Sequence, residues 1–212
     1  MIKVILVDDH TLVRDSLCRL LESEEDIEVL AQTGSGQEAV GLCKTFKPDV
    51  VVLDYGLPDT DGLEVTKKII DLELGIRIII LTMYSNEEYA IRLLQSGASG
   101  FVVKAASSDE LLNGIRKVAR KGVYISQQIL DKVVERMSIR NEKSPESLLS
   151  NREMQVIVKL ARGESTREVA ESMNLSQSTI ETYRSNILEK LKLRNNSDLT
   201  RFAIRRGLID LE

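Results

Sequence analysis

The first 121 residues alternate short apolar runs with longer amphipathic stretches, and this alternation constrains the fold more than any other feature of the sequence. Between the runs lie helix start signals, in which a serine precedes a glutamate by three residues, at Ser35, Ser85 and Ser107. Strands that alternate with helices predict a parallel sheet with helices on both faces. The expected α/β fold is flavodoxin-like, with five parallel strands in the order 2-1-3-4-5. The predicted strands are Val4–Val7, Ile27–Ala31, Val50–Leu53, Ile78–Leu81 and Phe101–Val103.

Beyond Lys121 the pattern changes to short helices without strand signals. Tyr124–Met137 favours a connecting helix, and Ser138–Ser147 is polar, charged and interrupted by Pro145, which is typical of a linker. Two further serine–glutamate signals, at positions 150 and 165, and two helix-ending glycines, at 163 and 207, follow in the sequence. We therefore predict an α/β domain over residues 1–121, a partly helical linker over 122–147, and an all-α domain over 148–212.

Composition and charge are those of an ordinary soluble protein. Hydrophobic residues make up 42% and charged residues 29% of the 212 residues. Two cysteines and a single histidine exclude a disulfide scaffold, a four-ligand zinc site and chemistry that needs paired histidines. No apolar run is long enough for a signal peptide or a membrane span, so we expect a cytoplasmic protein without a membrane partner. Residues 148–212 hold 11 Lys+Arg against 9 Asp+Glu, which is only weak support for nucleic-acid binding.

Polar side chains close the carboxyl ends of four predicted strands. Asp8 and Asp9 follow the first strand, Asp54 the third, Thr82 the fourth and Lys104 the fifth. Three crowded carboxylates repel one another unless a cation joins them, and oxygen ligands of this kind suit Mg²⁺. A carboxylate beside such an ion and an ammonium group can attack phosphorus and form an aspartyl phosphate. Each residue alone is more simply a helix cap or a solvated lysine, but their joint placement favours phosphoryl chemistry.

Four segments resemble the receiver domain of two-component response regulators: LVDDH (6–10), VVLDYGLPDTDG (51–62), IIILTMYS (78–85) and GASGFVVKA (97–105). The resemblance implies that Asp54 is the phosphoacceptor. It also implies that Asp9, Asp54 and the Gly56 carbonyl bind Mg²⁺ or Mn²⁺, with Asp8 assisting through water. Thr82 and Phe101 are implied as the switch pair that reports phosphorylation to the far face of the domain, and Phe101 is also simply a core residue of an edge strand.

The sequence departs from the family pattern at three positions near the acceptor. Gly56 stands where relatives usually carry a side chain, which leaves the acceptor more open and affects the lifetime of the phosphoryl group. Asp59 adds an acid where glycine is frequent, and Ala105 replaces the proline that often follows the lysine. Gly56 also argues against a phosphatase of the haloacid dehalogenase type, because such enzymes place a second aspartate at that position. We therefore expect no enzyme activity beyond slow self-dephosphorylation.

The C-terminal domain contains two helical stretches at the spacing of a helix-turn-helix motif, Thr166–Met173 and Ser178–Leu191, separated by Asn174–Gln177. Short polar side chains on one face of the second stretch suit base edges, and basic side chains near its end suit phosphates. An ordinary solvated helix face is an equally good interpretation of any single one of them. The candidate DNA contacts are Ser178, Thr179, Glu181, Thr182, Arg184, Ser185, Lys190 and Lys192, with Arg194 as a further phosphate contact.

The segment from Leu148 onward resembles the LuxR-type helix-turn-helix, and the whole chain then resembles the NarL/FixJ class of response regulators. The resemblance implies a four-helix domain in which Thr179–Leu191 is the recognition helix and Asn196–Arg206 a helix often used for dimerisation. Tyr183 occupies a position that is usually histidine in this family, so we expect altered docking detail on DNA.

The predicted function is that of a transcriptional regulator. A sensor histidine kinase would phosphorylate Asp54, and a homodimer would then bind a two-fold site on double-stranded DNA. In an alternative, DNA binding is independent of phosphorylation, and the α/β domain is a dimerisation or sensing module. In a more distant alternative, the helical domain binds a protein.

Overall fold

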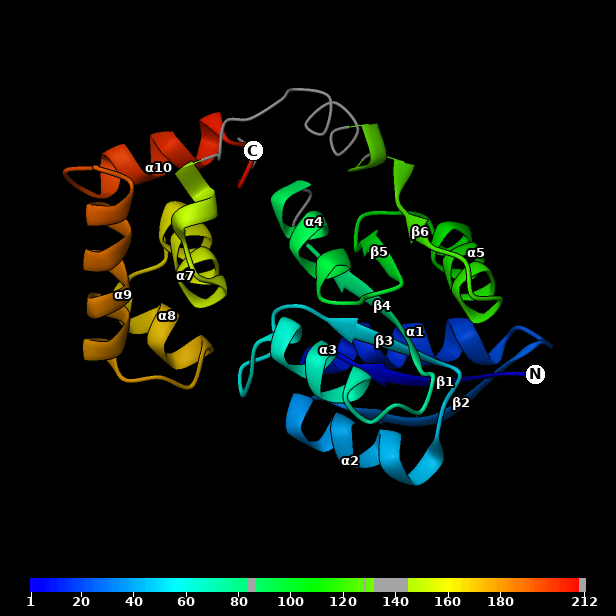
Figure 1. Ribbon diagram of the computed structural model, residues 1–212. Helices are drawn as coiled ribbons and strands as arrows, with labels where there is room; N and C mark the ends of the chain where they lie inside the picture. The colour runs from blue at the N-terminus through cyan, green and yellow to red at the C-terminus, as the bar shows by residue number, and fades with distance from the viewer. Residues whose placement is uncertain (84–86, 128, 132–144, 210–212) are drawn as a thin grey trace.

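The computed structural model describes residues 1–83, 87–127, 129–131 and 145–209 of the chain (Figure 1). An α/β domain is followed by a helical domain, which lies on the side of the α/β domain where α3 and α4 are found. The strands are β1 (Ile2–Val7), β2 (Ile27–Thr33), β3 (Val50–Asp54), β4 (Arg77–Thr82), β5 (Gly100–Val103) and β6 (Tyr124–Ile125). The helices of the α/β domain are α1 (Thr11–Glu22), α2 (Gly36–Phe46), α3 (Gly62–Ile70), α4 (Glu87–Gln95) and α5 (Ser108–Ala119).

The sheet is parallel, with strand order β2-β1-β3-β4-β5-β6. The five predicted strands and their order are confirmed. The sixth strand differs from the prediction, in which Tyr124 begins a connecting helix. The backbone of this short strand pairs with the edge of β5, where the Tyr124 amide donates to the Ser99 carbonyl at 3.1 Å. Residues 127 and 129–131 are helical, and the remainder of the expected connecting helix lies outside the described residues.

Every residue of β3 is buried, which explains its unbroken apolar run up to Asp54. One face of the sheet packs on α2, α3 and α4 through residues such as Ile80, Leu93 and Phe101. The opposite face packs on α1 and α5 through residues such as Leu21 and Ile115. Because helices cover both faces, the central strands are accessible only at their ends, and their carboxyl ends form the site described below.

Helix starts follow the predicted serine signals. Ser35 and Ser107 accept a hydrogen bond from the amide of the glutamate three residues later, at 3.2 and 3.3 Å. Ser150 and Ser165 form complete capping boxes, in which the glutamate also accepts from the serine amide at 2.7 Å in each case. The expected signal at Ser85 lies outside the described residues.

The helical domain consists, over its described residues, of a short 3₁₀ turn at Pro145–Leu148 followed by four helices, as predicted. Gly163 and Gly207 adopt φ values of 93° and 61° after the first and last of these helices, which is the left-handed conformation that glycine tolerates at a helix end. Among the described residues, no helix has the length and apolar character that crossing a membrane requires. The four helices are α7 (Asn151–Ala161), α8 (Thr166–Ser172), α9 (Gln177–Lys190) and α10 (Asn196–Arg205).

Candidate functional site

The carboxyl ends of β1, β3 and β5 bring two acids and a lysine into direct contact. The Lys104 ammonium lies 2.6 Å from Asp8 Oδ2 and 2.8 Å from Asp54 Oδ2. These side chains are nearly inaccessible to water, with 3%, 7% and 9% of the Asp8, Asp54 and Lys104 side chains exposed. The lysine is placed by the strand itself, because the Lys104 amide continues the β4–β5 ladder by donating to the Thr82 carbonyl at 2.7 Å.

Burial and charge oppose each other at this ion pair. Burial raises the pKa of Asp54, and the neighbouring carboxylate of Asp8 raises it further, while the Lys104 ammonium and the Gly56 amide pull it down. Burial works to lower the pKa of Lys104, but the charges and hydrogen bonds of Asp54 and Asp8 outweigh it and raise that pKa. The lysine therefore stays charged at neutral pH, and it is the cation that holds two carboxylates together in a dry site.

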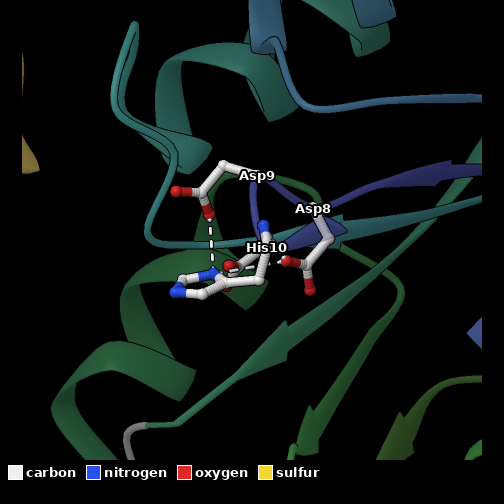
Figure 2. Close-up of side chains that lie close together, drawn as sticks. Asp8, Asp9 and His10 are labelled. Atoms are coloured by element: carbon white, nitrogen blue, oxygen red, sulfur yellow. Dashed lines mark hydrogen bonds and ion pairs between the residues drawn. The ribbon is translucent and has the colours of Figure 1, made fainter. Parts of the chain in front are cut away.

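Four side chains at this edge have ligand atoms within 4.8 Å of one another: Asp8, Asp9, His10 and Asp54. Three carboxylates of this kind are the hard oxygen donors that Mg²⁺ and Mn²⁺ bind, so the donor set fits such an ion. The three acids of this cluster were predicted from the sequence, whereas His10 was not. Its imidazole turns back toward the acids, with Nδ1 2.9 Å from Asp9 Oδ1 (Figure 2). Its position directly after the two aspartates was the signal that could have identified it.

Gly56 lies beside the Asp54 carboxylate. Its amide donates to Asp54 Oδ1 at 3.2 Å. A Cβ at this position would lie 3.9 Å from both carboxylate oxygens of Asp54, which is ordinary van der Waals contact. A side chain here would thus extend over the Asp54 carboxylate, and glycine leaves that approach open.

Thr82 and Phe101 lie on neighbouring strands and are both buried, with 1% and 0% of their surface exposed. Thr82 pairs in register with Val103, which is two residues after Phe101 on β5. Residues two apart in a strand point to the same face, so the two side chains share the face of the sheet that α4 covers. The structure thus places Thr82 at the site edge and Phe101 one layer deeper on the same face.

Asp59 was expected as an additional acid near the acceptor, and the structure gives it a different role. Its carboxylate accepts from the Ser35 hydroxyl at 2.7 Å and from the amides of Gly36 and Gln37 at 3.1 Å each. Burial raises the pKa of Asp59, but these hydrogen bonds outweigh it and lower that pKa. Asp59 therefore caps α2 and fastens the loop that follows Asp54 to that helix.

The candidate DNA contacts lie on α9 and just beyond it. Ser178, Glu181, Thr182 and Ser185 are exposed, and Thr179 is half-buried. A shallow depression in this surface is lined by Ser178, Thr179, Thr182 and Tyr183. In Figure 1, α9 lies on the side of the helical domain that is turned away from the α/β domain.

Charged candidates near this face have partners within the helical domain. The Arg184 guanidinium donates to the Asn196 side chain at 2.7 Å, and Glu181 accepts from Gln177 at 3.2 Å. Lys190 donates to both carboxylate oxygens of Glu153, at 2.7 and 2.9 Å. A phosphate contact by Lys190 would therefore compete with an existing ion pair. Ser178 and Thr182 are exposed, although the Ser178 hydroxyl lies 2.8 Å from the Ser176 hydroxyl and the Thr182 hydroxyl donates to the Ser178 carbonyl at 2.9 Å.

Comparisons with known proteins agree with this geometry. Residues 4–116 match the family of response regulator receiver domains, and residues 147–203 match the bacterial regulatory proteins of the luxR family. The response regulator UvrY of Escherichia coli (strain K12) is 35% identical over 213 residues, which cover 100% of this chain and 98% of UvrY. The response regulator GacA of Pseudomonas aeruginosa is 34% identical, over 99% of each protein.

Among solved structures, the response regulator ChrA of a heme-sensing two-component system is similar over 98% of each chain, with 29% identity and a TM-score of 0.54. The receiver match alone spans more than half of the chain, and UvrY and GacA are similar over nearly their full length. The receiver match covers the domain that contains the parallel sheet and its acidic edge, and the luxR match covers the helical domain that contains the helix-turn-helix. The chain therefore belongs to the NarL/FixJ family of response regulators, with a receiver domain followed by a LuxR-type DNA-binding domain.

Proposed function

We propose that Asp54 accepts a phosphoryl group from a partner histidine kinase and that phosphorylation activates DNA binding. The observation that carries this proposal is the buried contact of the Lys104 ammonium with both Asp54 and Asp8. An ordinary capping aspartate does not require a buried lysine and a second acid beside it. The proposed domains are a receiver over residues 1–121, a partly helical linker over 122–147 and a DNA-binding domain over 148–212.

In the phosphoryl transfer, an Asp54 carboxylate oxygen attacks the phosphorus of a phosphohistidine. The new O–P bond forms as the P–N bond breaks, and the leaving imidazole keeps the bonding electron pair and takes up a proton. The Lys104 ammonium is already 2.8 Å from Asp54 Oδ2, so it neutralises charge that develops on the phosphoryl oxygens. We expect no turnover beyond slow hydrolysis of the aspartyl phosphate.

A divalent ion fits the same edge of the sheet. Asp9, Asp54 and the Gly56 carbonyl would hold Mg²⁺ or Mn²⁺ directly, and Asp8 would assist through water. Such an ion supplies positive charge that screens the phosphoryl oxygens from the carboxylates. The Thr82 hydroxyl would donate to the phosphoryl group, and Phe101, on the same face of the sheet, would follow its movement.

For DNA binding, we propose that a homodimer places α9 of each copy in successive major grooves of a two-fold site. The exposed hydroxyl residues of α9 support this assignment, and Lys192, beyond its end, is an exposed phosphate contact. The proposed base contacts are Ser178, Thr179, Glu181, Thr182 and Ser185, and the proposed phosphate contacts are Arg184, Lys190, Lys192 and Arg194. A cytoplasmic location follows from the need to reach both kinase and DNA.

Intact-mass spectrometry with a small phosphodonor tests the proposal. Incubation with phosphoramidate and Mg²⁺ should give a single phosphoryl adduct on the wild type, and no adduct in the presence of a chelator. The Asp54→Asn variant should give none. An adduct that persists in Asp54→Asn would move the acceptor to another residue. Absence of any adduct would favour the alternative in which the receiver domain is a dimerisation or sensing module and DNA binding needs no phosphate.

A further inference from the structure

His10 stands directly before α1, but its side chain does not cap that helix. Serine, threonine, aspartate and asparagine are the usual residues at such a position, because their side chains accept from free amides of the first turn. Within the described part of the chain, the His10 side chain makes no hydrogen bond of this kind. The side chain is 65% exposed, so it is not part of the core either. The folding of α1 therefore does not require a histidine here.

The backbone turns the imidazole back over the acidic edge of the sheet. The His10 amide donates to Asp8 Oδ1 at 2.9 Å, which closes a tight turn around Asp9. The ring then lies with Nδ1 2.9 Å from Asp9 Oδ1 and 3.4 Å from Asp8 Oδ1 (Figure 2). Asp9 Oδ1 is buried and accepts no hydrogen bond from a described residue. Two ligand atoms, Nδ1 and Asp9 Oδ1, thus approach each other closely without the geometry of a hydrogen bond.

The spacing of these atoms matches that of ligands around a single ion. Donor atoms held about 2.1 Å from one ion lie about 3.0–3.4 Å apart when they are neighbours in an octahedron or a tetrahedron. The two distances from His10 Nδ1, 2.9 and 3.4 Å, are close to this range. All four ligand atoms of the cluster lie within 4.8 Å of one another, so small side-chain rotations would bring them onto one ion.

Lys104 occupies one side of the acids and leaves the other side to an ion. Its ammonium pairs with the Oδ2 atoms of Asp8 and Asp54. The Oδ1 atom of Asp8 is the one that faces the imidazole. The three carboxylates of the cluster and the one ammonium sum to a charge of −2, which a divalent ion balances when the imidazole is neutral. Neutral imidazole is also the form that binds metal ions.

An imidazole nitrogen changes the kind of ion that this edge prefers. Mg²⁺ takes oxygen ligands and keeps several of its waters, so it gains little from His10. Zn²⁺, Ni²⁺ and Co²⁺ bind imidazole nitrogen together with carboxylate oxygen. Three carboxylate oxygens and one imidazole nitrogen make up the four protein ligands that a closed Zn²⁺ site requires.

We propose a second metal-binding mode of this edge, in which a divalent ion that prefers imidazole, such as Zn²⁺, replaces Mg²⁺ and is held by Asp8, Asp9, His10 and Asp54. Asp9 and Asp54 are ligands in both modes, so the two ions exclude each other. The zinc mode does not depend on phosphoryl transfer and goes beyond the proposed function. Only the exclusion of Mg²⁺ rests on the magnesium site of that function.

Isothermal titration calorimetry of the full chain with ZnCl₂, and separately with MgCl₂, tests this mode. His10→Gln keeps a polar side chain but removes the ring. We expect it to weaken Zn²⁺ binding by about tenfold or more and to leave Mg²⁺ binding unchanged. Equal Zn²⁺ affinities in wild type and His10→Gln would show an adventitious ion only. An equal loss of affinity for both ions would show that His10 acts on the acids and not as a ligand, and would also overturn the proposal.

Two further variants separate this site from other groups that bind Zn²⁺. Cys18→Ser is the matched control, because Cys18 is a half-buried thiol on the same helix, and it should leave Zn²⁺ affinity unchanged. A loss as large as that in His10→Gln would assign the ion to the thiol. Asp9→Asn should weaken binding of both ions, because Asp9 is a ligand in both modes. Loss of Mg²⁺ binding alone in Asp9→Asn would mean that Zn²⁺ binds elsewhere.

The imidazole can be observed directly, because His10 is the one histidine of the sequence. A ligating Nδ1 carries no proton, so Zn²⁺ should shift its ¹⁵N resonance and fix the tautomer with the proton on Nε2. MgCl₂ should leave both ring resonances near their positions in the free protein. A zinc-induced shift at Nε2 in place of Nδ1, or calorimetric binding without any shift, would overturn the role of His10. Neither result would affect the phosphoryl adduct on Asp54, so the proposed function is tested separately.

Discussion

The carboxyl edge of the receiver sheet and the outer face of α9 are both built from polar side chains, but they differ in exposure to water. Asp8, Asp54 and Lys104 are less than a tenth exposed, and the single ammonium pairs with the two carboxylates at 2.6 and 2.8 Å. Ser178 and Thr182 on α9 are exposed. In the first region each group depends on its neighbours inside the protein, whereas in the second the decisive partner is outside it.

This difference in exposure predicts that charge interactions differ in strength and in salt screening between the two regions. Charge interactions in a dry site are strong and only weakly screened by salt, and removing one partner leaves an uncompensated buried charge. Charge interactions on an exposed face are weak within the free protein and become important only when a polyanion is bound. Substitutions at the sheet edge should therefore disturb stability and site chemistry together, and substitutions on the exposed face of α9 should disturb binding alone.

Removal of the aromatic ring beneath the site should have the largest effect on stability. Phe101 is completely buried on the face of the sheet that also carries Thr82, so Phe101→Ala leaves a cavity. We expect a loss of about 3–5 kcal/mol in the free energy of unfolding, measured by urea denaturation. Thr182→Ala, on the exposed face of α9, should change it by no more than about 0.5 kcal/mol. Comparable losses in the two variants would contradict the contrast between the regions.

Two glycines of α2 offer a matched pair of substitutions, one of them where this helix packs on the loop that follows Asp54. A Cβ on Gly36 would lie 2.3 Å from Thr60 Cγ2 and 2.6 Å from Val65 Cγ2, whereas a Cβ on Gly41 meets nothing within 4 Å. We expect Gly36→Ala to lower the free energy of unfolding by about 1–3 kcal/mol through overpacking. Gly41→Ala should raise it by about 1 kcal/mol, because alanine is the better helix former. An unchanged free energy of unfolding in Gly36→Ala would mean that the contact of α2 with Thr60 and Val65 is looser than its packing indicates.

The Glu153–Lys190 pair tests whether burial, and not the domain in which a group lies, sets the strength of its charge interactions. Burial raises the pKa of Glu153, but hydrogen bonds from Lys190 and Ser150 outweigh it and lower that pKa. A carboxyl whose pKa is lower in the folded than in the unfolded state stabilises above the unfolded value of about 4.5, and this stabilisation is lost as the pH falls through the folded pKa. Glu153→Gln should therefore cost about 1–2 kcal/mol at neutral pH.

The difference between wild type and Glu153→Gln should shrink as the pH falls below the ordinary glutamate range, in urea denaturation series at several pH values. Glu189→Gln, exposed on α9, is the control and should be nearly neutral at every pH. A gap between wild type and Glu153→Gln that stays constant from neutral to acidic pH would show that the carboxylate charge does not contribute.

The strands, the helix starts and the three acids were predictable because their signals are local. Val50–Leu53 is apolar without interruption, and Ser150 stands three residues before Glu153, so the sequence itself carries the information. The short strand Tyr124–Ile125 was missed because two residues show no periodicity, and its hydrogen bonds depend on an edge that only the folded sheet provides. The resemblance to the receiver family then implied a separate role for each acid, which composition alone does not do.

The role of Asp59 and the burial of Gln155 could not be predicted, for a related physical reason. An aspartate in a loop beside an acidic site is expected to add charge to that site, but the α2 amides are a better partner for its carboxylate. A glutamine on a helix is expected to face water, and Gln155 is buried only because α7 packs on the receiver domain. Both depend on which elements meet in space, and this is decided by packing across the whole chain.

The smallest effect on stability is expected at the exposed end of α9. A substitution there has to be tested by its effect on DNA binding. Lys192 is exposed just beyond α9, at φ 54°, so Lys192→Gln should leave the free energy of unfolding within about 0.5 kcal/mol of the wild type. If its ammonium neutralises one phosphate, the slope of log K against log salt, measured with a random-sequence duplex, should become shallower by about 0.9. Lys121→Gln is the matched control, because Lys121 is exposed at φ 64° in a comparable helix-end position of the receiver domain. An equal change of slope in both variants would mean that the affinity for the duplex depends on the net charge of the protein. A change in Lys192→Gln alone would place the phosphate backbone at the end of α9.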